Sequence, residues 1–264
     1  MKAENFGAAF LDVDLPFPCE IHFSYYYAGS QPGRYKVLLL FTEPEAIRIS
    51  EADLAACHSH FDLIMTHDKR HLGYPSARYF PFNDPWVREL PNIKRFEVST
   101  ILSTGCRLPT VLGYHQRVEL ANRRRELDFP TRYYISNKFP GKEQTGLPTL
   151  IDDKKDCLFE SMFHIAIENG AEPDYCTEKL LDCFMTYTVP IYIGFPNLHE
   201  YFNPDAIIRA RDVDDIIRIV NGLSLRDYYE RLSALQENRA KVGDPAPFLE
   251  QVRSLILKCK AEQL

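Results

Sequence analysis

Two adjacent residues of opposite charge, Glu178 and Lys179, stand at the start of a predicted helix that runs from Thr177 to about Thr186. Thr177 is the expected N-cap. A glutamate in the first turn suits the helix dipole, whereas a lysine there opposes the dipole and favours an anionic partner. Adjacent residues project about 100° apart on a helix, so the two side chains can serve different groups of one ligand. An ammonium on a phosphate and a carboxylate on a ribose diol would suit a nucleotide sugar.

The helix lies inside a predicted strand–helix–strand unit at residues 163–197, FHIAIENGAEPDYCTEKLLDCFMTYTVPIYIGFPN. FHIAIE and VPIYIG are typical of buried strands, and an Asn-Gly turn follows the first strand. Such crossovers bind ligands at the carboxyl ends of their strands. At that edge the sequence places Glu168, Asn169, Tyr175, Glu178 and Lys179. Free helix amides, a cation and acids together suit an anionic ligand that also carries hydroxyl groups.

Two other segments carry candidate site residues. Arg117 follows a glycine in GYHQR, near the start of a predicted helix from Gln116 to Leu127, where its side chain can point into a cleft between domains. Glu43 and Glu45 lie in FTEPEAI, directly after the apolar strand YKVLLLF. The carboxyl end of a parallel strand is where α/β folds present catalytic groups. Either glutamate is therefore a candidate catalytic group, and the alternative is a solvated loop acid.

Patterns that would indicate a metal site are weak. DVD triplets occur at 12–14 and 212–214, but the first is typical of an alternating edge strand and the second of a cap for the helix that follows. The seven cysteines are scattered without a CxxC pair, so neither a zinc site nor a disulfide framework is expected. Four histidines lie close in sequence without metal-site spacing, namely His58, His60, His67 and His71. We predict no metal site.

Composition excludes several classes of protein. The formal net charge of −6 argues against a broad surface for nucleic acid. The first residues lack the apolar core of a signal peptide, and no stretch approaches the roughly 18 apolar residues that span a bilayer. Free cysteines suit a reducing compartment. The sequence thus predicts a cytoplasmic protein without a membrane span.

Buried strands alternate with short helices throughout the 264 residues, a pattern typical of an α/β fold with largely parallel sheets. Predicted strands cover residues 35–41, 61–66, 78–82, 96–104, 132–136 and 206–210. Predicted helices cover residues 50–58, 213–221, 225–240 and 247–262. His164, inside FHIAIE, is expected in the core. We place the domain boundary near Pro91 to Lys94, which gives domains 1–93 and 94–264.

The motifs at residues 163–197 resemble the signature of the α1,3-fucosyltransferase family, glycosyltransferase family 10. That signature has a strand ending in ENS or ENT, then DYxTEK or GYxTEK, then a VPIY or IPIY strand with Gly-x-Pro. VSTILSTG followed by GYHQR is similar to the first strand and arginine helix of the family's second domain. FTEPEAI is similar to the segment that carries the family's proposed base. Gly170 departs from the usual small hydroxyl residue, and the first domain is shorter than is usual.

The resemblance implies a GT-B fold, in which two Rossmann-like domains face a cleft and the short N-terminal domain lies on the acceptor side. It implies an inverting transfer of fucose from GDP-fucose to a glycan hydroxyl, without a metal cofactor. Arg117 would meet the diphosphate, and Glu43 would be the base with Glu45 as the second candidate. The implied contacts to the donor come from Asn169, Tyr175, Glu178 and Lys179.

Two alternatives remain open. The protein could be a GT-B transferase that uses another sugar nucleotide, or a non-catalytic protein that binds a nucleotide sugar or a glycan. The short first domain is the feature that suggests the second alternative. Because the membrane anchor and stem of animal Golgi members are not seen, a bacterial or viral setting is expected.

Overall fold

The computed structural model describes residues 13–23, 32–40, 49–81, 84–102, 111–136, 146–150 and 154–263. The chain forms two compact units, each built on a parallel sheet. Unit 1 comprises Met1–Asp84, Glu172–Tyr175 and Asp244–Leu264. Unit 2 comprises Pro85–Ala171 and Cys176–Gly243. The predicted α/β class with parallel sheets is therefore confirmed.

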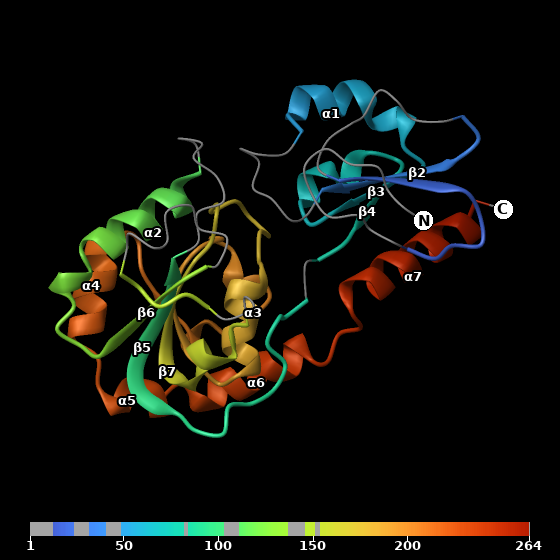
Figure 1. Cartoon of the computed structure of the whole chain (residues 1–264). Coiled ribbons are helices and arrows are strands. Elements are labelled where there is room, and N and C mark those ends of the chain that lie inside the picture. Colours follow the sequence, from blue (N-terminus) through green and yellow to red (C-terminus); the bar gives the residue numbers. More distant parts are fainter. Residues whose placement is uncertain are drawn as a thin grey trace. The chain divides into compact units, whose positions relative to one another are not determined.

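The sheet of unit 1 has four parallel strands in the order β1-β2-β3-β4. The strands are β1 (Cys19–Phe23), β2 (Tyr35–Leu40), β3 (Leu63–Thr66) and β4 (Ala77–Tyr79). Helices α1 (Glu51–Cys57) and α7 (Phe248–Ala261) cover opposite faces of this sheet (Figure 1). Two short 3₁₀ helices, η2 (His58–His60) and η3 (Lys69–Gly73), follow α1 and β3.

The packing of strand β2 explains why its apolar run, YKVLLL, could be recognised in the sequence as a buried strand. Leu39 packs in the core that α7 covers, whereas Leu40 packs with Leu54 of α1 on the other face. A strand buried on both faces needs apolar side chains at successive positions, and YKVLLL supplies them. Ser50 caps α1 as predicted, because its side chain accepts a hydrogen bond from the backbone N–H of Asp53 at 3.1 Å.

The two units do not coincide with the predicted domains, which divide the chain into residues 1–93 and 94–264. The chain passes into unit 2 at Pro85, and the segment from Asp244 returns to unit 1. The return has a packing cause, because Val252 and Ile256 of α7 are 0% exposed and share a core with β1, β2 and β3. A single boundary along the chain cannot represent such a return.

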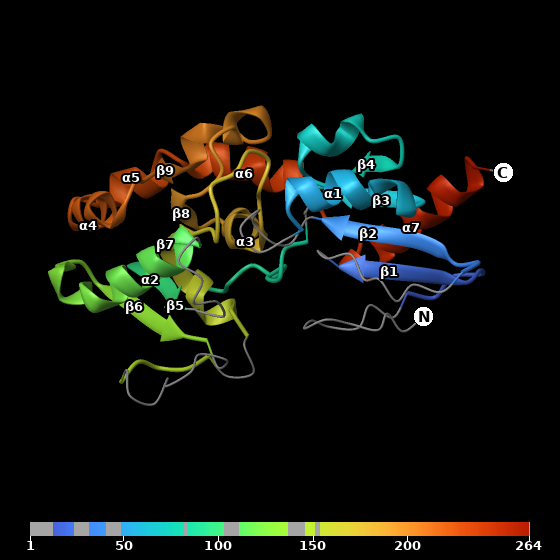
Figure 2. The same cartoon turned by 90° about the horizontal axis from the view of Figure 1, so that it is seen from above.

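The sheet of unit 2 has five parallel strands in the order β6-β5-β7-β8-β9 (Figure 2). They are β5 (Arg95–Leu102), β6 (Thr131–Ile135), β7 (Ser161–Ile167), β8 (Val189–Ile193) and β9 (Ile208–Arg209). The helices are α2 (Leu112–Asn122), α3 (Glu178–Met185), α4 (Val213–Asn221), α5 (Leu225–Tyr229) and α6 (Leu232–Val242). Short 3₁₀ helices are η4 (Arg124–Glu126), η7 (Asp156–Glu160), η8 (Leu198–Glu200) and η9 (Pro204–Ala206). Because β6 and β7 flank β5 on opposite sides, the strand order reverses there, at a topological switch point.

The predicted strand–helix–strand unit is confirmed as β7–α3–β8. The two strands are parallel, with Phe163 opposite Val189, and every residue of β7 is buried. His164 is a core residue as predicted, 3% exposed, with its Nδ1 atom 2.8 Å from the Ser99 hydroxyl. Burial lowers the pKa of His164 to about 3, so the ring is neutral.

Two predicted helices were wrong in their extent. Helix α2 begins and ends several residues before the predicted Gln116–Leu127, and Gly113 lies inside its first turn. The predicted single helix at 225–240 is two helices, α5 and α6, which are separated at Glu230 and Arg231. The guanidinium of Arg231 donates to the Asp227 carbonyl at 2.7 Å at this break.

Gly113 is required by a close approach of two backbones. A Cβ atom at this position would lie 1.7 Å from the carbonyl oxygen of Glu168. We therefore expect Gly113→Ala to lower the free energy of unfolding by about 1–3 kcal/mol, because the first turn of α2 must move away from the end of β7. Gly222→Ala is the control, since its Cβ atom would make only ordinary contacts, the nearest at 3.5 Å. Equal Tm values for the two variants would contradict this account.

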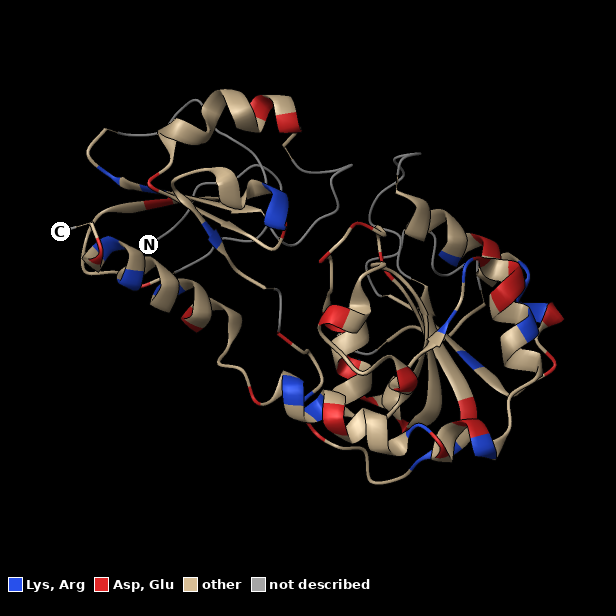
Figure 3. Cartoon of the chain, turned by 180° about the vertical axis from the view of Figure 1, so that it is seen from behind, with Lys and Arg blue, Asp and Glu red and all other residues tan. Residues whose placement is uncertain are grey.

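Charged residues of both signs occur on the helices of unit 2 and on α7 of unit 1, whereas α1 carries only the acids Glu51 and Asp53, as Figure 3 shows. Within the part of the chain that is described, we find no helix that combines the length and the apolar character needed to cross a membrane.

Candidate active site

Arg117 and Asn169 meet at the switch point of unit 2. The Arg117 guanidinium donates through Nη2 to the side-chain oxygen of Asn169, which directly follows the end of β7. Its Nε atom donates to the Gly113 carbonyl at 3.0 Å, and its guanidinium lies 4.6 Å from the ring centre of Tyr114. Arg117 is 6% exposed. It lies in the middle of α2, and its guanidinium is directed back toward the end of β7.

The N-terminus of α3 holds a carboxylate of the protein itself. Thr177 is the N-cap, as predicted, and its hydroxyl accepts from the Lys179 backbone N–H at 3.4 Å. The Glu168 carboxylate accepts from the Thr177 N–H at 3.1 Å and from the Thr177 hydroxyl at 2.6 Å. Glu168 is only 1% exposed. The expectation of free amides is therefore wrong for Thr177, whose N–H is occupied by this buried acid.

Lys179 lies between two carboxylates. Its Nζ atom is 3.4 Å from Glu178 Oε1 and 3.6 Å from Glu168 Oε2. Burial alone would lower the pKa of Lys179, but these two acids outweigh it and raise the pKa above its ordinary value. The predicted need for an anionic partner is thus met inside unit 2 by two side chains.

A second lysine, which the sequence analysis missed, completes this network. Lys155 lies 3.1 Å from Glu178 Oε1 and 3.7 Å from Asp182 Oδ2, with its ammonium 4.0 Å from the ring centre of Trp86. Asp182 is 0% exposed and accepts from the backbone N–H groups of Trp86 and Val87 at 2.7 and 3.0 Å. Burial raises the pKa of Asp182 to about 7. No motif spacing connects Lys155 to α3, so only the fold reveals the contact.

The state of Glu178 follows from these neighbours. Burial alone would raise its pKa, but the ammonium groups of Lys155 and Lys179 outweigh burial and lower the pKa to about 2. Glu178 is therefore an ionised acceptor at neutral pH, although its side chain is only 10% exposed.

The remaining predicted site residues are Tyr175, Glu43 and Glu45. Tyr175 belongs to a segment of unit 1, where it is 1% exposed and its ring centre lies 5.6 Å from that of His67. Tyr175 is therefore assigned to a different unit from the other four predicted donor residues. Glu43 and Glu45 lie outside the described residues.

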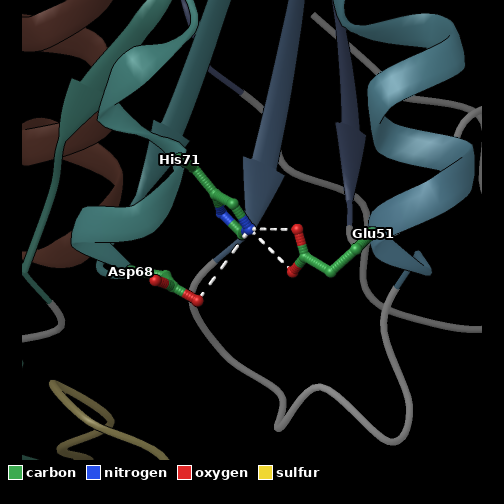
Figure 4. A group of neighbouring side chains, drawn as sticks. All are labelled: Glu51, Asp68 and His71. Carbon is green, nitrogen blue, oxygen red and sulfur yellow. Dashed lines mark hydrogen bonds and ion pairs between the residues drawn. The ribbon is translucent and has the colours of Figure 1, made fainter.

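One group of three potential metal ligands occurs among the described residues, namely Glu51, Asp68 and His71 in unit 1 (Figure 4). The His71 Nε2 atom lies 2.9 Å from Glu51 Oε1 and 3.9 Å from Asp68 Oδ2. Arg70 donates to both oxygens of Asp68, and His71 Nδ1 lies 3.1 Å from the Thr66 hydroxyl. These hydrogen bonds and ion pairs satisfy the group without an ion.

The second DVD triplet is a helix cap, as predicted. Asp212 is the N-cap of α4, and its carboxylate accepts from the Asp215 N–H at 2.8 Å. The Asp215 carboxylate in turn pairs with Arg211 and Arg218 at 2.6 and 2.7 Å. Asp12 of the first triplet lies outside the described residues.

The fold has counterparts among solved structures. A crystal structure of alpha1,3-fucosyltransferase with GDP-fucose superposes with a TM-score of 0.51 and 15% identity, over 90% of this chain and 77% of the other. A crystal structure of alpha1,3-fucosyltransferase with GDP gives a TM-score of 0.53 and 16% identity, over 94% of this chain and 78% of the other. The architecture is GT-B-like, with two parallel α/β units.

The resemblance to glycosyltransferase family 10 is also confirmed. Residues 132–233 match the family described as "Glycosyltransferase family 10 (fucosyltransferase) C-term". The Helicobacter pylori protein "Alpha-(1,3)-fucosyltransferase FucT" is 32% identical over 113 residues, which are 42% of this chain and 24% of that protein. An Arabidopsis thaliana "Putative fucosyltransferase-like protein" is 32% identical over 65 residues, 24% of this chain and 13% of that protein. The matched segments thus span a quarter or less of these relatives.

Proposed function

We propose that this protein is an inverting glycosyltransferase that transfers fucose from GDP-fucose to a hydroxyl group of a glycan. One observation carries the proposal. Within unit 2, which contains most of the segment matching family 10, Arg117 and Lys179 converge with acids and an amide at the switch point, where doubly wound sheets bind nucleotides. Both cations are largely buried, so they suit a few local contacts to a diphosphate.

Each residue of the site has a proposed role at the donor. Lys179 and Arg117 meet the diphosphate, and Asn169 orients the Arg117 guanidinium through its hydrogen bond. Glu178, ionised and fixed, accepts from ribose hydroxyls. Tyr175 is assigned to the donor by the family resemblance alone.

The proposed reaction is a direct displacement. A glutamate, Glu43 or the second candidate Glu45, takes the proton from the acceptor hydroxyl as that oxygen attacks the anomeric carbon of fucose. The bond from this carbon to GDP breaks, and negative charge grows on the diphosphate. Lys179 and Arg117 stabilise that charge, as a bound cation does in other transferases. Unit 2 would hold the donor, and unit 1 would supply the acceptor side.

The compartment is part of the proposal. The described cysteines are free, and most of them are buried. Free thiols suit a reducing environment, which supports a cytoplasmic location of the bacterial or viral kind.

GDP is expected to bind more tightly than UDP or ADP, and to do so in EDTA. The cations of the proposed site belong to the protein, and the Glu51–Asp68–His71 group is satisfied without an ion. Isothermal titration calorimetry of the three nucleotides in EDTA is the measurement. Loss of GDP binding on chelation would contradict the metal-free site, and a preference for UDP would favour a transferase with another donor.

Transfer itself is tested with GDP-fucose on a glycan array. Fucosylation of at least one glycan is the expected result, and it would also identify the acceptor. GDP binding without transfer to any glycan, and without slow hydrolysis of GDP-fucose, would favour a non-catalytic binding protein.

A further inference from the structure

Lys155 is held by partners from two other parts of unit 2. Its ammonium contacts Glu178 and Asp182, one turn apart on α3, and it lies over the ring of Trp86, which follows the start of the unit. Asp182 is itself fixed by backbone N–H groups. The Lys155 side chain is 11% exposed. A lysine with so little freedom keeps one position relative to the start of α3.

The charges at the start of α3 create a conflict for Lys179. This lysine is proposed to bind a phosphate, yet it already neutralises Glu178 and Glu168. When Lys179 turns toward a ligand, Glu178 becomes a buried carboxylate that needs another counter-ion, because an unpaired buried charge is strongly unfavourable. Lys155 can meet that need, since at 3.1 Å it lies closer to Glu178 than Lys179 does at 3.4 Å.

We infer that Lys155 is a positioning residue of the donor site, which holds Glu178 in place and leaves Lys179 available to the diphosphate. The inference rests on the proposed function for its ligand, but the ion pair that it requires exists without nucleotide. Lys155 does not itself contact the donor in this scheme. Its effect on affinity passes through Glu178, which distinguishes it from a residue that only fills space beside Trp86.

The test is a double-mutant cycle that combines Lys155→Met with Glu178→Gln. Lys155→Met removes the charge and keeps an unbranched side chain beside Trp86. In calorimetry with GDP, Lys155→Met should weaken binding about tenfold, since Glu178 then competes with the diphosphate for Lys179. In the Glu178→Gln background, Lys155→Met should weaken GDP binding less than twofold. Lys155→Arg should restore affinity to within about threefold, because it restores the charge. Lys154→Met is the matched control, since Lys154 is the exposed neighbour on the same segment.

The same double-mutant cycle is then measured without ligand, with the Tm of thermal unfolding as the readout. Lys155→Met should lower Tm by about 5–10 °C, because it leaves the buried Asp182 without a counter-ion and Glu178 with Lys179 alone, and the double variant should regain about half of that loss. If GDP fails to bind even the wild type, the proposed function fails while the Tm cycle still tests Lys155. Additive Tm losses, or a double variant no more stable than Lys155→Met, would overturn the inference. A GDP affinity for Lys155→Met equal to that of Lys154→Met would also overturn it.

Discussion

Replacing Lys179 by alanine is expected to weaken GDP binding about 10- to 100-fold and to slow transfer. A charge-assisted contact to phosphate in a largely buried site contributes about 1.5–3 kcal/mol, which corresponds to this range. The Lys179 side chain is 20% exposed and is held at the start of α3 by Thr177 and two acids, so it is already near the place where the phosphate is proposed to bind. Calorimetry with GDP measures the loss.

The structure adds a second consequence for this variant. Alanine leaves Glu168 with only its hydrogen bonds to Thr177 and Tyr192, and leaves Glu178 with Lys155 alone. Circular dichroism and Tm must therefore accompany the binding data. Lys241→Ala, on the exposed side of α6, controls for the loss of a lysine in the same unit. Normal GDP binding by a folded Lys179→Ala variant would show that the start of α3 is an ordinary capped helix and not the donor site.

The β7–α3–β8 unit could be predicted because each of its signals is local. Strands buried on both faces require continuous apolar runs, and an N-cap needs one hydroxyl before the first turn. Both signals are present in the sequence, at Phe163 to Ile167 and at Thr177. Local signals also placed Asn169, Glu178 and Lys179 at one edge of a sheet.

What could not be predicted are contacts between distant segments. Lys155 reaches α3 from a polar stretch that precedes η7, and the Glu168 carboxylate occupies a helix start nine residues further along the chain. Each depends on three-dimensional placement, for which periodicity and spacing carry no signal. Gly113 illustrates the same limit, since the sequence carries no signal that the backbone at Glu168 leaves no room for a side chain at this position.

Glu43→Gln is expected to lower transfer by about 10²- to 10⁴-fold while GDP affinity stays near that of the wild type. The expectation starts from β2, which ends at Leu40 and pairs with parallel strands on both sides. The segment that contains Glu43 leads from the carboxyl end of this central strand to α1, which begins at Glu51. Carboxyl ends of parallel strands are where such sheets present reacting groups, so this segment is where unit 1 would offer a base.

The chemistry explains why the loss should be confined to turnover. A sugar hydroxyl is a poor nucleophile until its proton is being removed, and glutamine keeps the shape of glutamate while it lacks the basicity. Four of the five proposed donor residues, namely Arg117, Asn169, Glu178 and Lys179, belong to unit 2, and Glu43 is not among the five, so the nucleotide should still bind. Glu45→Gln is the paired variant, because the similarity of FTEPEAI to the family segment allows a shift of two residues. Transfer rates with GDP-fucose are measured beside GDP affinities for both variants. Full activity in both would assign the base to another part of unit 1 and leave FTEPEAI as a loop that only connects β2 to α1.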